Sequence, residues 1–435
     1  MDWSQLFKPT WWKAHILAGN YNDAKVSRKH RPDYAIVLIM GLLMLLGLII
    51  IYAIGPQRAI VLNNAYGADY DSWYFFRKQV QSLIIALVAF IIAFKFPITK
   101  LGKFNSIILV VAVSASLILA IAGALDLSFT KTALGATRWF VIGGVSIQPS
   151  EFLKIAILLF GAGFLGNRVK QGKINNFGET ILPIVGIMAV ALFLVVVVQK
   201  DLGTGIAMVA IGASALFVSG MDKKILLRLL VISLIVGSLM IVFSPHRMVR
   251  ITTFFKGDST TVDDAGSYHI EHAKIAIGSG GMFGVGIGNS VQATGYLPEA
   301  INDSVFAIMG ETFGFIGLVV IMLLFVWLLM RLLNLSENLA DPRLKLIAIG
   351  IFGWLVAHVL LNIGAMIGFI PLTGITLPLL SFGGTSMLFI SAALGLAFQL
   401  SGYTEHTSNL KEAKNENSYS RRGVGRTRHS RRGGY

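Results

Sequence analysis

The sequence predicts an all-α polytopic membrane protein with ten transmembrane helices, and two observations support this prediction. Of the 435 residues, 55% are hydrophobic and only 14% are charged, whereas a soluble domain carries about 25% charged residues. The chain also contains ten apolar runs close to the length of about 20 residues that a helix needs to cross a bilayer. The formal net charge of +15 then reflects the charge asymmetry that orients membrane helices, not nucleic-acid binding.

The predicted spans follow one another along most of the chain. The first apolar run ends without a small-residue cleavage pattern and is therefore expected to be a retained helix, not a signal peptide. The ten spans cover residues 35–54, 80–96, 105–125, 151–165, 181–198, 203–218, 226–243, 304–329, 346–367 and 385–400.

Basic residues orient these spans with both termini in the cytoplasm. Each of the four short loops that would then face inward holds three basic residues, as the positive-inside rule predicts. These residues are Lys95, Lys100 and Lys103; Arg168, Lys170 and Lys173; Lys223, Lys224 and Arg228; and Arg331, Arg343 and Lys345. The outer segments are 55–79, 126–150, 371–384 and the large extracytoplasmic loop 244–303, between helices 7 and 8. The functional groups are therefore expected to face outward.

The chain divides into a cytoplasmic tail (1–33), a membrane domain (34–403) and a second cytoplasmic tail (404–435). The first tail carries three tryptophans among lysines, which is typical of an interfacial anchor, and a mobile tail is the alternative. The second tail ends in SRRGVGRTRHSRRGGY and lacks the apolar residues needed to fold. It is expected to be disordered and to contact anionic membrane lipids, not nucleic acid.

Three acids flank the start of the eighth span. Glu299 and Asp303 precede it, and Glu311 lies inside it. If a helix begins at Pro298, Glu299 and Asp303 lie one turn apart on one face, and two carboxylates that close raise the pKa of one of them. Such a carboxylate can accept a proton from a hydroxyl, so Asp303 is the candidate catalytic base. A helix cap or an ion pair is the alternative for Asp303.

Outward cations could hold a phosphate group near this base. Arg138 lies in the second outer segment, and a guanidinium is suited to phosphate oxygens. Arg77, Lys78 and Lys131 are further candidates, either as phosphate ligands or as side chains that extend to the membrane interface. Glu299 is assigned to the same substrate-binding set.

A third group of polar residues is expected to support the bundle. Glu151 and Lys154 are three residues apart inside the fourth span, where pairing makes both tolerable. Glu311, two turns into the eighth span, is expected to pair with a cation or a hydroxyl. Asp201 lies in a polar turn, QKDLGTG, and Ser381 in the apolar outer turn PLTGITLPLLSFGG.

Cofactor signals in the sequence are weak. His269 and His272 stand one turn apart beside Glu271, Asp263 and Asp264, a set that could ligate a divalent cation such as Mg or Mn, and solvated loop residues are the alternative. The glycine-rich stretch GSGGMFGVGIG allows close backbone approach but matches neither the P-loop nor the dinucleotide fingerprint. No cysteine is present, which excludes disulfides and thiolate metal sites.

Five motifs together resemble one known family. They are GATRWFVIGGVSIQPSEFLKI, QKDLGTG, AIGSGGMFGVGIGNS, YLPEAINDSVFAIMGE and PLTGITLPLLSFGGTS. In this order and spacing, within ten spans, they resemble the SEDS (shape, elongation, division, sporulation) polymerases of the FtsW/RodA group. The resemblance covers residues 33–403, and YLPEA and GNSVQ favour the FtsW branch.

The resemblance implies a SEDS-type bundle that polymerises lipid II into peptidoglycan strands at the outer face of the bacterial cytoplasmic membrane, at the division septum. It places the family's essential aspartate at Asp303, in NDSVFA, and the arginine of its RRW-like motif at Arg138. It implies an inverting hexosyl transfer. The implied partners are a class B penicillin-binding protein (a transpeptidase) and other division proteins.

Three alternatives remain open at this point. A RodA-type elongation polymerase would have the same chemistry in a different process. A lipid II flippase should carry ionisable residues that reach the inner leaflet, whereas the acids here gather at the outer side. A non-catalytic scaffold that recruits the transpeptidase would tolerate replacement of Asp303.

Overall fold

The structure is a computed structural model that describes residues 31–133, 136–143, 145–256 and 265–404. The tails predicted for residues 1–33 and 404–435 lie almost wholly outside this part of the chain. Asp263 and Asp264, two of the candidate metal ligands, lie outside it as well.

All ten predicted spans are helices in the described residues. Nine are long and apolar enough to cross a membrane, and the tenth, α7, is a shorter apolar helix. The helices are α2 (Tyr34–Tyr66), α3 (Tyr74–Lys95), α4 (Ile98–Ala124), α5 (Pro149–Lys170), η3 (Phe177–Ile181), α6 (Leu182–Leu192), η4 (Phe193–Val198), α7 (Leu202–Val218), α8 (Lys223–Val242), α9 (Pro245–Lys256), α10 (Ala265–Ser279), η5 (Gln292–Thr294), α11 (Val305–Glu337), α12 (Pro342–Met366) and α13 (Gly384–Ser401). The fifth span is one continuous run of η3, α6 and η4.

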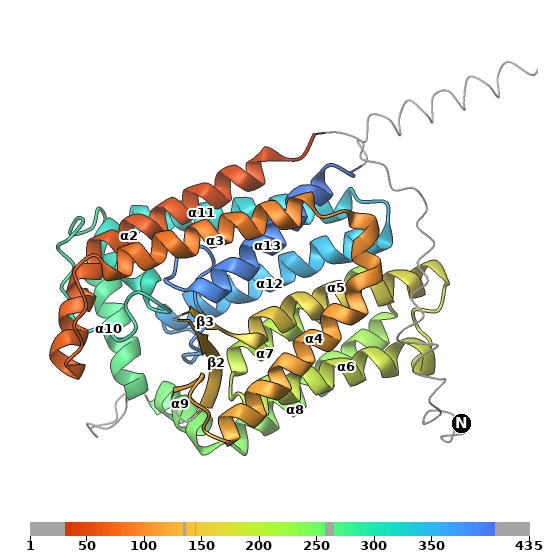
Figure 1. Ribbon diagram of the computed structural model, residues 1–435, viewed down its shortest axis with the longest axis horizontal. Coiled ribbons are helices and arrows are strands. Elements are labelled where there is room, and N and C mark those ends of the chain that lie inside the picture. Colours follow the sequence, from red (N-terminus) through yellow and green to blue (C-terminus); the bar gives the residue numbers. More distant parts are fainter. Residues whose placement is uncertain (1–30, 134–135, 144, 257–264, 405–435) are drawn as a thin grey trace, which may run out of the picture.

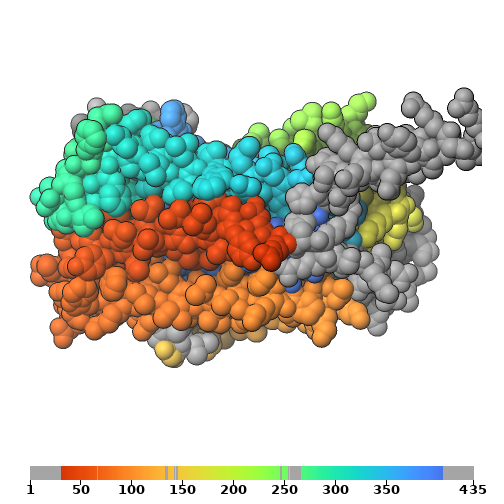
Figure 2. All heavy atoms as spheres, turned by 90° about the horizontal axis from the view of Figure 1, so that it is seen from above, coloured from red at the N-terminus to blue at the C-terminus, as the bar shows by residue number. Residues whose placement is uncertain are grey.

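The spans form a single elongated bundle. α2 lies between α3 and α11, so the first helix of the membrane domain packs against a helix from its later part (Figure 1; Figure 2). α9, α10 and the strands lie at one end of the bundle, and the start of α2 lies at the other (Figure 1). α8 packs against α7 and α9 and has no buried residue, which leaves its apolar side chains for lipid.

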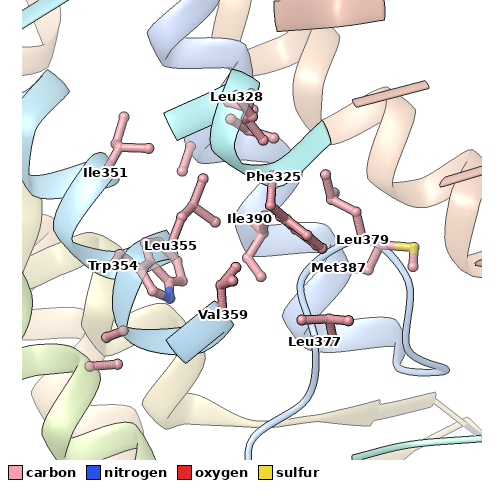
Figure 3. Close-up of a cluster of buried hydrophobic side chains, with 14 of the residues drawn as sticks. Phe325, Leu328, Ile351, Trp354, Leu355, Val359, Leu377, Leu379, Met387 and Ile390 are labelled. Atoms are coloured by element: carbon pink, nitrogen blue, oxygen red, sulfur yellow. The ribbon is translucent and has the colours of Figure 1, made fainter. Parts of the chain in front are cut away.

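The core forms where α11, α12 and α13 meet the irregular outer segment that precedes α13. Phe325 from α11, Trp354 from α12 and Ile390 from α13 converge there with Leu377 from the outer segment (Figure 3). All four side chains are buried. The outer segment is thus built into the core and is not a surface loop, which matters for the site described below.

The second outer segment contains a small sheet that the sequence analysis did not predict. Strands β1 (Thr130–Ala133), β2 (Ala136–Ile142) and β3 (Val145–Ile147) pair antiparallel in the order β1-β2-β3. Phe140 pairs with Thr130 on one side and with Ile147 on the other. The run ATRWFVI is rich in β-branched and aromatic residues, which suit a half-buried strand. The sheet, with Arg138 on β2, lies at the end of the bundle that also holds α9 and α10 (Figure 1).

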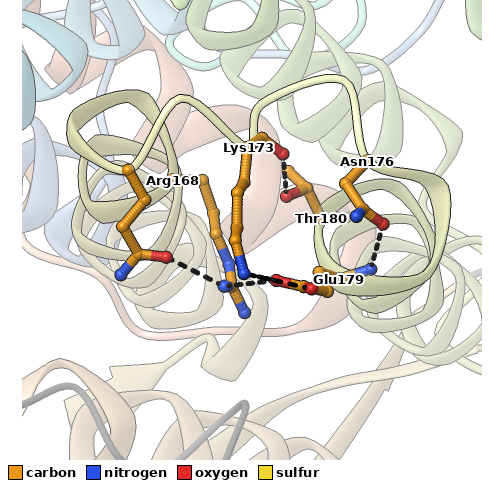
Figure 4. A network of polar contacts seen from close by, with 6 residues as sticks. Arg168, Lys173, Asn176, Glu179 and Thr180 are labelled. Carbon is orange, nitrogen blue, oxygen red and sulfur yellow. Dashed lines mark hydrogen bonds and ion pairs between the residues drawn. The ribbon is translucent and has the colours of Figure 1, made fainter.

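At the opposite end, the loop between α5 and the fifth span is held by charge. Arg168 Nη1 and Lys173 Nζ lie 3.3 and 2.9 Å from Glu179 Oε2 (Figure 4). The Glu179 amide donates to Asn176 Oδ1, and Thr180 Oγ1 donates to the Lys173 carbonyl oxygen. Two of the three basic residues of this predicted inner loop therefore also order it.

Candidate functional site

Asp303 lies at the start of α11, directly before its first turn, and faces the 371–377 segment. A Cβ added at Gly374 of that segment would lie 4.0 Å from Asp303 Oδ2. Asp303 Oδ1 is buried and has no hydrogen-bond partner among the described residues. The structure therefore leaves one carboxylate oxygen free to accept a proton.

The helix expected to begin at Pro298 is absent, so the sequence prediction that Glu299 and Asp303 share a helix face is wrong. Residues 298–304 form consecutive turns, and the helix begins at Val305. Ser304 Oγ donates to the Pro298 carbonyl oxygen at 2.8 Å, and Glu299 adopts a left-handed φ of 47°. A serine that bonds nearby backbone favours a turn over a helix, which explains the late helix start.

Burial and Glu299 together adjust the acidity of the candidate base. Burial is the larger cause and the negative charge of Glu299 the second; they raise the pKa of Asp303 to about 7, and Arg250 opposes them. Glu299 itself is half-exposed and lies 3.7 Å from Arg58. A carboxylate with this pKa is ionised in an appreciable fraction of molecules at neutral pH and still holds a proton well, which suits a general base.

Three arginines lie near one another, and one of them, Arg250, lies near this base. Arg138 is close enough to Arg247 and Arg250 that its charge lowers the pKa of both, after the larger effect of burial. Among the described residues, none of the three forms an ion pair with a carboxylate, and each donates to backbone carbonyl oxygens, of Gln199 and Lys200 (Arg138), Met240 and Val196 (Arg247) and Leu372 (Arg250). Clustered guanidiniums without a carboxylate partner can bind an anion such as a diphosphate.

The sequence analysis missed Arg247 and Arg250. Both lie on α9, three residues apart and therefore on one face of the helix. Two arginines at this spacing in an outer loop, where the positive-inside rule disfavours them, are a signal that could have identified them. Arg250 is the cation whose charge acts on the pKa of Asp303, whereas the sequence analysis gave Arg138 as the first candidate cation near this base.

The turn before α7 places Arg138. Asp201 caps α7 by accepting from the Thr204 amide at 2.9 Å, and its other oxygen accepts from Gln148 Nε2 at 3.1 Å. Lys200 is held in a left-handed conformation with φ 52°. Asp201 therefore joins the start of α7 to the residues just before α5, and the Arg138 side chain rests on the resulting turn.

The other predicted cations are not brought to Asp303. Arg77 is exposed and pairs with Asp71 at 2.7 Å, and Lys131 is exposed on β1. Lys78 is half-buried on α3. The charges that act on Asp303 come from Glu299 and Arg250, so the roles given to Arg77, Lys78 and Lys131 in substrate binding stay predictions.

Glu151 and Lys154 form a buried ion pair of 2.7 Å. Lys154 Nζ also lies 3.0 Å from His358 Nε2 and 4.8 Å from the centre of the Trp354 ring. Because Lys154 is a donor, His358 Nε2 accepts, and its Nδ1–H donates to the Thr376 carbonyl oxygen at 3.2 Å. A chain of polar contacts therefore runs from Glu151 through Lys154 and His358 on α12 to the 371–377 segment.

Glu311 holds the glycine-rich loop. Its carboxylate accepts from Ser290 Oγ at 2.5 Å and from the Val291 amide at 2.9 Å. A Cβ added at Gly284 would lie 2.2 Å from the Thr312 carbonyl oxygen, so glycine allows the loop to pack on the backbone of α11. The Glu311 carboxylate therefore faces this loop.

The two candidate metal ligands are engaged with protein groups. His269 Nε2 lies 2.5 Å from Ser304 Oγ, and His272 Nδ1 lies 2.8 Å from Gln292 Oε1. Burial lowers the pKa of His269 to about 4, so its imidazole is neutral at physiological pH. In the described residues no three His, Asp or Glu side chains group as a metal site, and a divalent cation stays a prediction.

Sequence comparisons match this arrangement to known proteins. Residues 33–406 match the family of cell cycle proteins FtsW, RodA and SpoVE. The chain is 34% identical over 386 residues to stage V sporulation protein E of Bacillus subtilis, with 87% of this chain and 100% of that protein covered. It is 30% identical over 375 residues to a probable peptidoglycan glycosyltransferase FtsW of Nitrosomonas europaea, with 85% and 93% covered.

Solved structures share the fold. A chain of a peptidoglycan synthase complex, described as coordinating polymerization and crosslinking, matches with a TM-score of 0.65 at 22% identity, over 85% of this chain and 97% of that chain. The rod shape determining protein RodA of Thermus thermophilus matches with a TM-score of 0.59 at 24% identity, over 86% and 98%.

Proposed function

The chain belongs to the FtsW, RodA and SpoVE family, and from this premise we propose that it is a peptidoglycan glycosyltransferase that polymerises lipid II, with Asp303 as its catalytic base. The observation that carries the proposal is the state of Asp303: its Oδ1 is buried without a partner among the described residues, and its pKa is raised to about 7. A relative of 30% identity is named a probable peptidoglycan glycosyltransferase.

The proposed reaction is one inverting displacement. The 4-hydroxyl of the incoming GlcNAc attacks the anomeric carbon of the growing strand, and its proton passes to the Asp303 carboxylate. The bond from that carbon to the lipid diphosphate breaks, and the diphosphate leaves with the bonding electrons. An α-linked donor then gives a β-1,4 product, which requires one base beside the acceptor and no covalent intermediate.

A diphosphate leaving group needs positive charge more than it needs a proton. Arg138, Arg247 and Arg250 supply that charge in this proposal, because they lie near one another, Arg250 acts on Asp303, and none of them has an ion-pair partner in the part of the chain that the structure describes. All three are half-buried, and partial burial strengthens attraction to an anion. The unpaired arginines would thus stabilise the charge that develops as the bond breaks.

The proposed orientation places this site outside the cytoplasmic membrane and both termini in the cytoplasm. The basic loops support it, and the inner loop of Arg168 and Lys173 lies at the end of the bundle opposite α9 and α10 (Figure 1). The proposed role at the division septum rests on the family description, cell cycle protein, and on a relative named stage V sporulation protein E. A class B penicillin-binding protein is the proposed partner, since a neighbour of the same fold comes from a complex described as coordinating polymerization and crosslinking.

The test is polymerisation of labelled lipid II by the purified chain, alone and with its transpeptidase partner. We expect Asp303→Asn to abolish strand formation while leaving the folded, monodisperse protein unchanged, and wild-type activity to fall as the pH drops through about 7. Strands made by Asp303→Asn at the wild-type rate would overturn the proposal. Transbilayer movement of lipid II in liposomes without product would favour a flippase instead.

A further inference from the structure

Asn362 makes a two-point contact behind the candidate base. It lies on α12, is 2% exposed, and its Nδ2 donates at 2.7 Å to the carbonyl oxygen of Asp303 and at 2.7 Å to that of Ile375. A carboxamide nitrogen has two protons, and both are used here. The two acceptors also fix which way the amide points, because the reverse orientation would set oxygen against oxygen.

The 371–377 segment that faces Asp303 is held at four of its residues. Side chains from α9 and α12, and one from the residues that follow the segment, bond its backbone. Arg250 donates to the Leu372 oxygen (3.2 Å), Asn362 to the Ile375 oxygen (2.7 Å) and His358 to the Thr376 oxygen (3.2 Å), and the Leu377 amide donates to Ser381 Oγ (2.8 Å). Of these side chains, only that of Asn362 also bonds Asp303.

The backbone on the other side of the base is held as well. Ser304 Oγ donates to the Pro298 oxygen at 2.8 Å, so the His269 Nε2–H donates to Ser304 at 2.5 Å. The carbonyl oxygen of Asp303 therefore accepts a hydrogen bond from Asn362 on α12, and the side chain of the next residue, Ser304, accepts one from His269 on α10. Its Oδ1 has no partner among the described residues. The arrangement fixes the backbone of the base and leaves its carboxylate oxygen free.

We propose that Asn362 is a positioning residue of the glycosyl transfer, which sets the distance between the Asp303 carboxylate and the 371–377 segment by binding both carbonyl oxygens at once. This inference rests on the proposed function of Asp303. Asn362 touches neither substrate nor reacting atoms. Its effect reaches the reaction through Asp303, and a shift of about 1 Å in a reacting group can lower a rate about 100-fold.

Only an amide can fill this role. Leucine has nearly the shape of asparagine but no donor, so both carbonyl oxygens would be left buried without a partner. Glutamine keeps both donors on a side chain longer by one methylene group. The Leu variant therefore tests the loss of the two N–H donors, and the Gln variant tests the effect of a longer side chain that keeps both donors.

The experiment measures lipid II polymerisation by the full-length purified chain across a range of pH, with kcat and KM determined separately. Glu299 and Arg250, the charges that act on Asp303, and His269, which bonds the next residue, stay in place in every variant. Asn105→Leu is the matched control, because Asn105 is also buried and its Nδ2 also donates to a carbonyl oxygen, that of Leu159 at 2.9 Å. Thermal unfolding is measured in parallel.

For Asn362→Leu we expect kcat to fall about 10- to 100-fold with KM for lipid II within about twofold of wild type. The acid limb of the pH profile should move to lower pH, because a loosened Asp303 is less buried and burial is what raises its pKa. Asn362→Gln should lie between Leu and wild type in both respects. Asn105→Leu should lower thermal stability and leave both kcat and the acid limb unchanged.

A purely structural role predicts a different result. Asn362→Leu would then resemble Asn105→Leu, with lower stability but wild-type kcat and acid limb for the folded protein, and the inference would be overturned. If the Leu variant does not fold, Asn362→Gln decides alone by the same two readouts. Should Asp303→Asn polymerise in the same preparations, the proposed function fails, whereas an inactive Asp303→Asn beside a fully active Asn362→Leu removes only the positioning role.

Discussion

Glu299 acts on Asp303 through charge although the two carboxylates do not share a helix. The turns of residues 298–304 bring them close enough that Glu299 adds to the burial that raises the pKa of Asp303 to about 7. Arg58, 3.7 Å from Glu299, neutralises part of that charge. Glu299 is half-exposed, so its influence depends on solvent and salt.

Glu299→Gln is therefore expected to move the acid limb of polymerisation to lower pH. The negative charge that disfavours ionisation of Asp303 is removed, so its pKa falls, but only in part because burial is the larger cause. Activity at pH 6 should rise by a few-fold relative to activity at pH 8. The measurement is the pH profile of kcat, with Glu337→Gln at the far end of α11 as the control. An unchanged acid limb would contradict the charge effect.

Arg250→Ala should have two separable consequences. Loss of a cation aimed at the leaving diphosphate should lower kcat by about 100- to 1000-fold. Loss of the charge that favours ionised Asp303 should also raise the pKa of Asp303, so the acid limb moves to higher pH, opposite to the Glu299 variant. Arg250→Lys keeps the positive charge but loses the planar, several-donor guanidinium that can bind two phosphate oxygens at once. It should leave the acid limb of the pH profile at the wild-type pH while lowering kcat.

Arg77→Ala is the control for this prediction. Arg77 is exposed and paired with Asp71, so its removal should change kcat by less than about twofold if it acts only at the surface. A loss as large as that of Arg250→Ala would restore Arg77 to the substrate-binding set, to which the sequence analysis assigned it.

His269 should make stability depend on pH in the acid range. Burial lowers its pKa from 6.5 to about 4, so the folded state prefers the neutral imidazole. The resulting stability is complete above about pH 6.5 and is lost as the pH falls toward 4, by at most about 3 kcal/mol. His269→Gln can keep the hydrogen bond to Ser304 without titrating. Its melting temperature should therefore fall less between pH 6.5 and 4 than that of wild type, and equal slopes would contradict the assignment.

The ten spans and the place of Asp303 directly before the eighth span could be predicted from the sequence because both depend on local properties. The length of an apolar run fixes a span, and a carboxylate at the end of such a run lies at the membrane boundary. Arg138 carried its own signal, a guanidinium at an outer surface. These features need no knowledge of which helices touch.

The remainder of the site depends on contacts between distant residues. Arg250 on α9 and Asn362 on α12 both act on Asp303. The periodicity of the sequence does not predict that these distant residues lie close together. The preference of proline for the first turn of a helix predicted a helix from Pro298. Ser304 instead bonds the Pro298 carbonyl oxygen and stabilises turns there, so the helix begins later. Lys131 was a further outward candidate beside Arg138, but of the two only Arg138 donates to the turn before α7.

Lys154 and Glu151 give the sharpest test of how the membrane core supports the site. Both side chains are buried, and Lys154→Met would leave Glu151 charged without its partner, at a cost of about 3–5 kcal/mol. The double variant Glu151→Gln with Lys154→Met should recover most of this loss, because no unpaired charge remains. Thermal unfolding of the single and double variants measures the coupling.

Lys173→Met is the matched control for Lys154→Met, since Lys173 pairs with Glu179 at 2.9 Å but its side chain is 49% exposed. It should cost at most about 1 kcal/mol. If Lys154→Met costs no more than Lys173→Met, the buried pair is not what holds this part of the bundle. A large cost accompanied by lower kcat in the folded fraction would show that the pair also acts through His358 on the 371–377 segment, the same segment that Asn362 ties to Asp303.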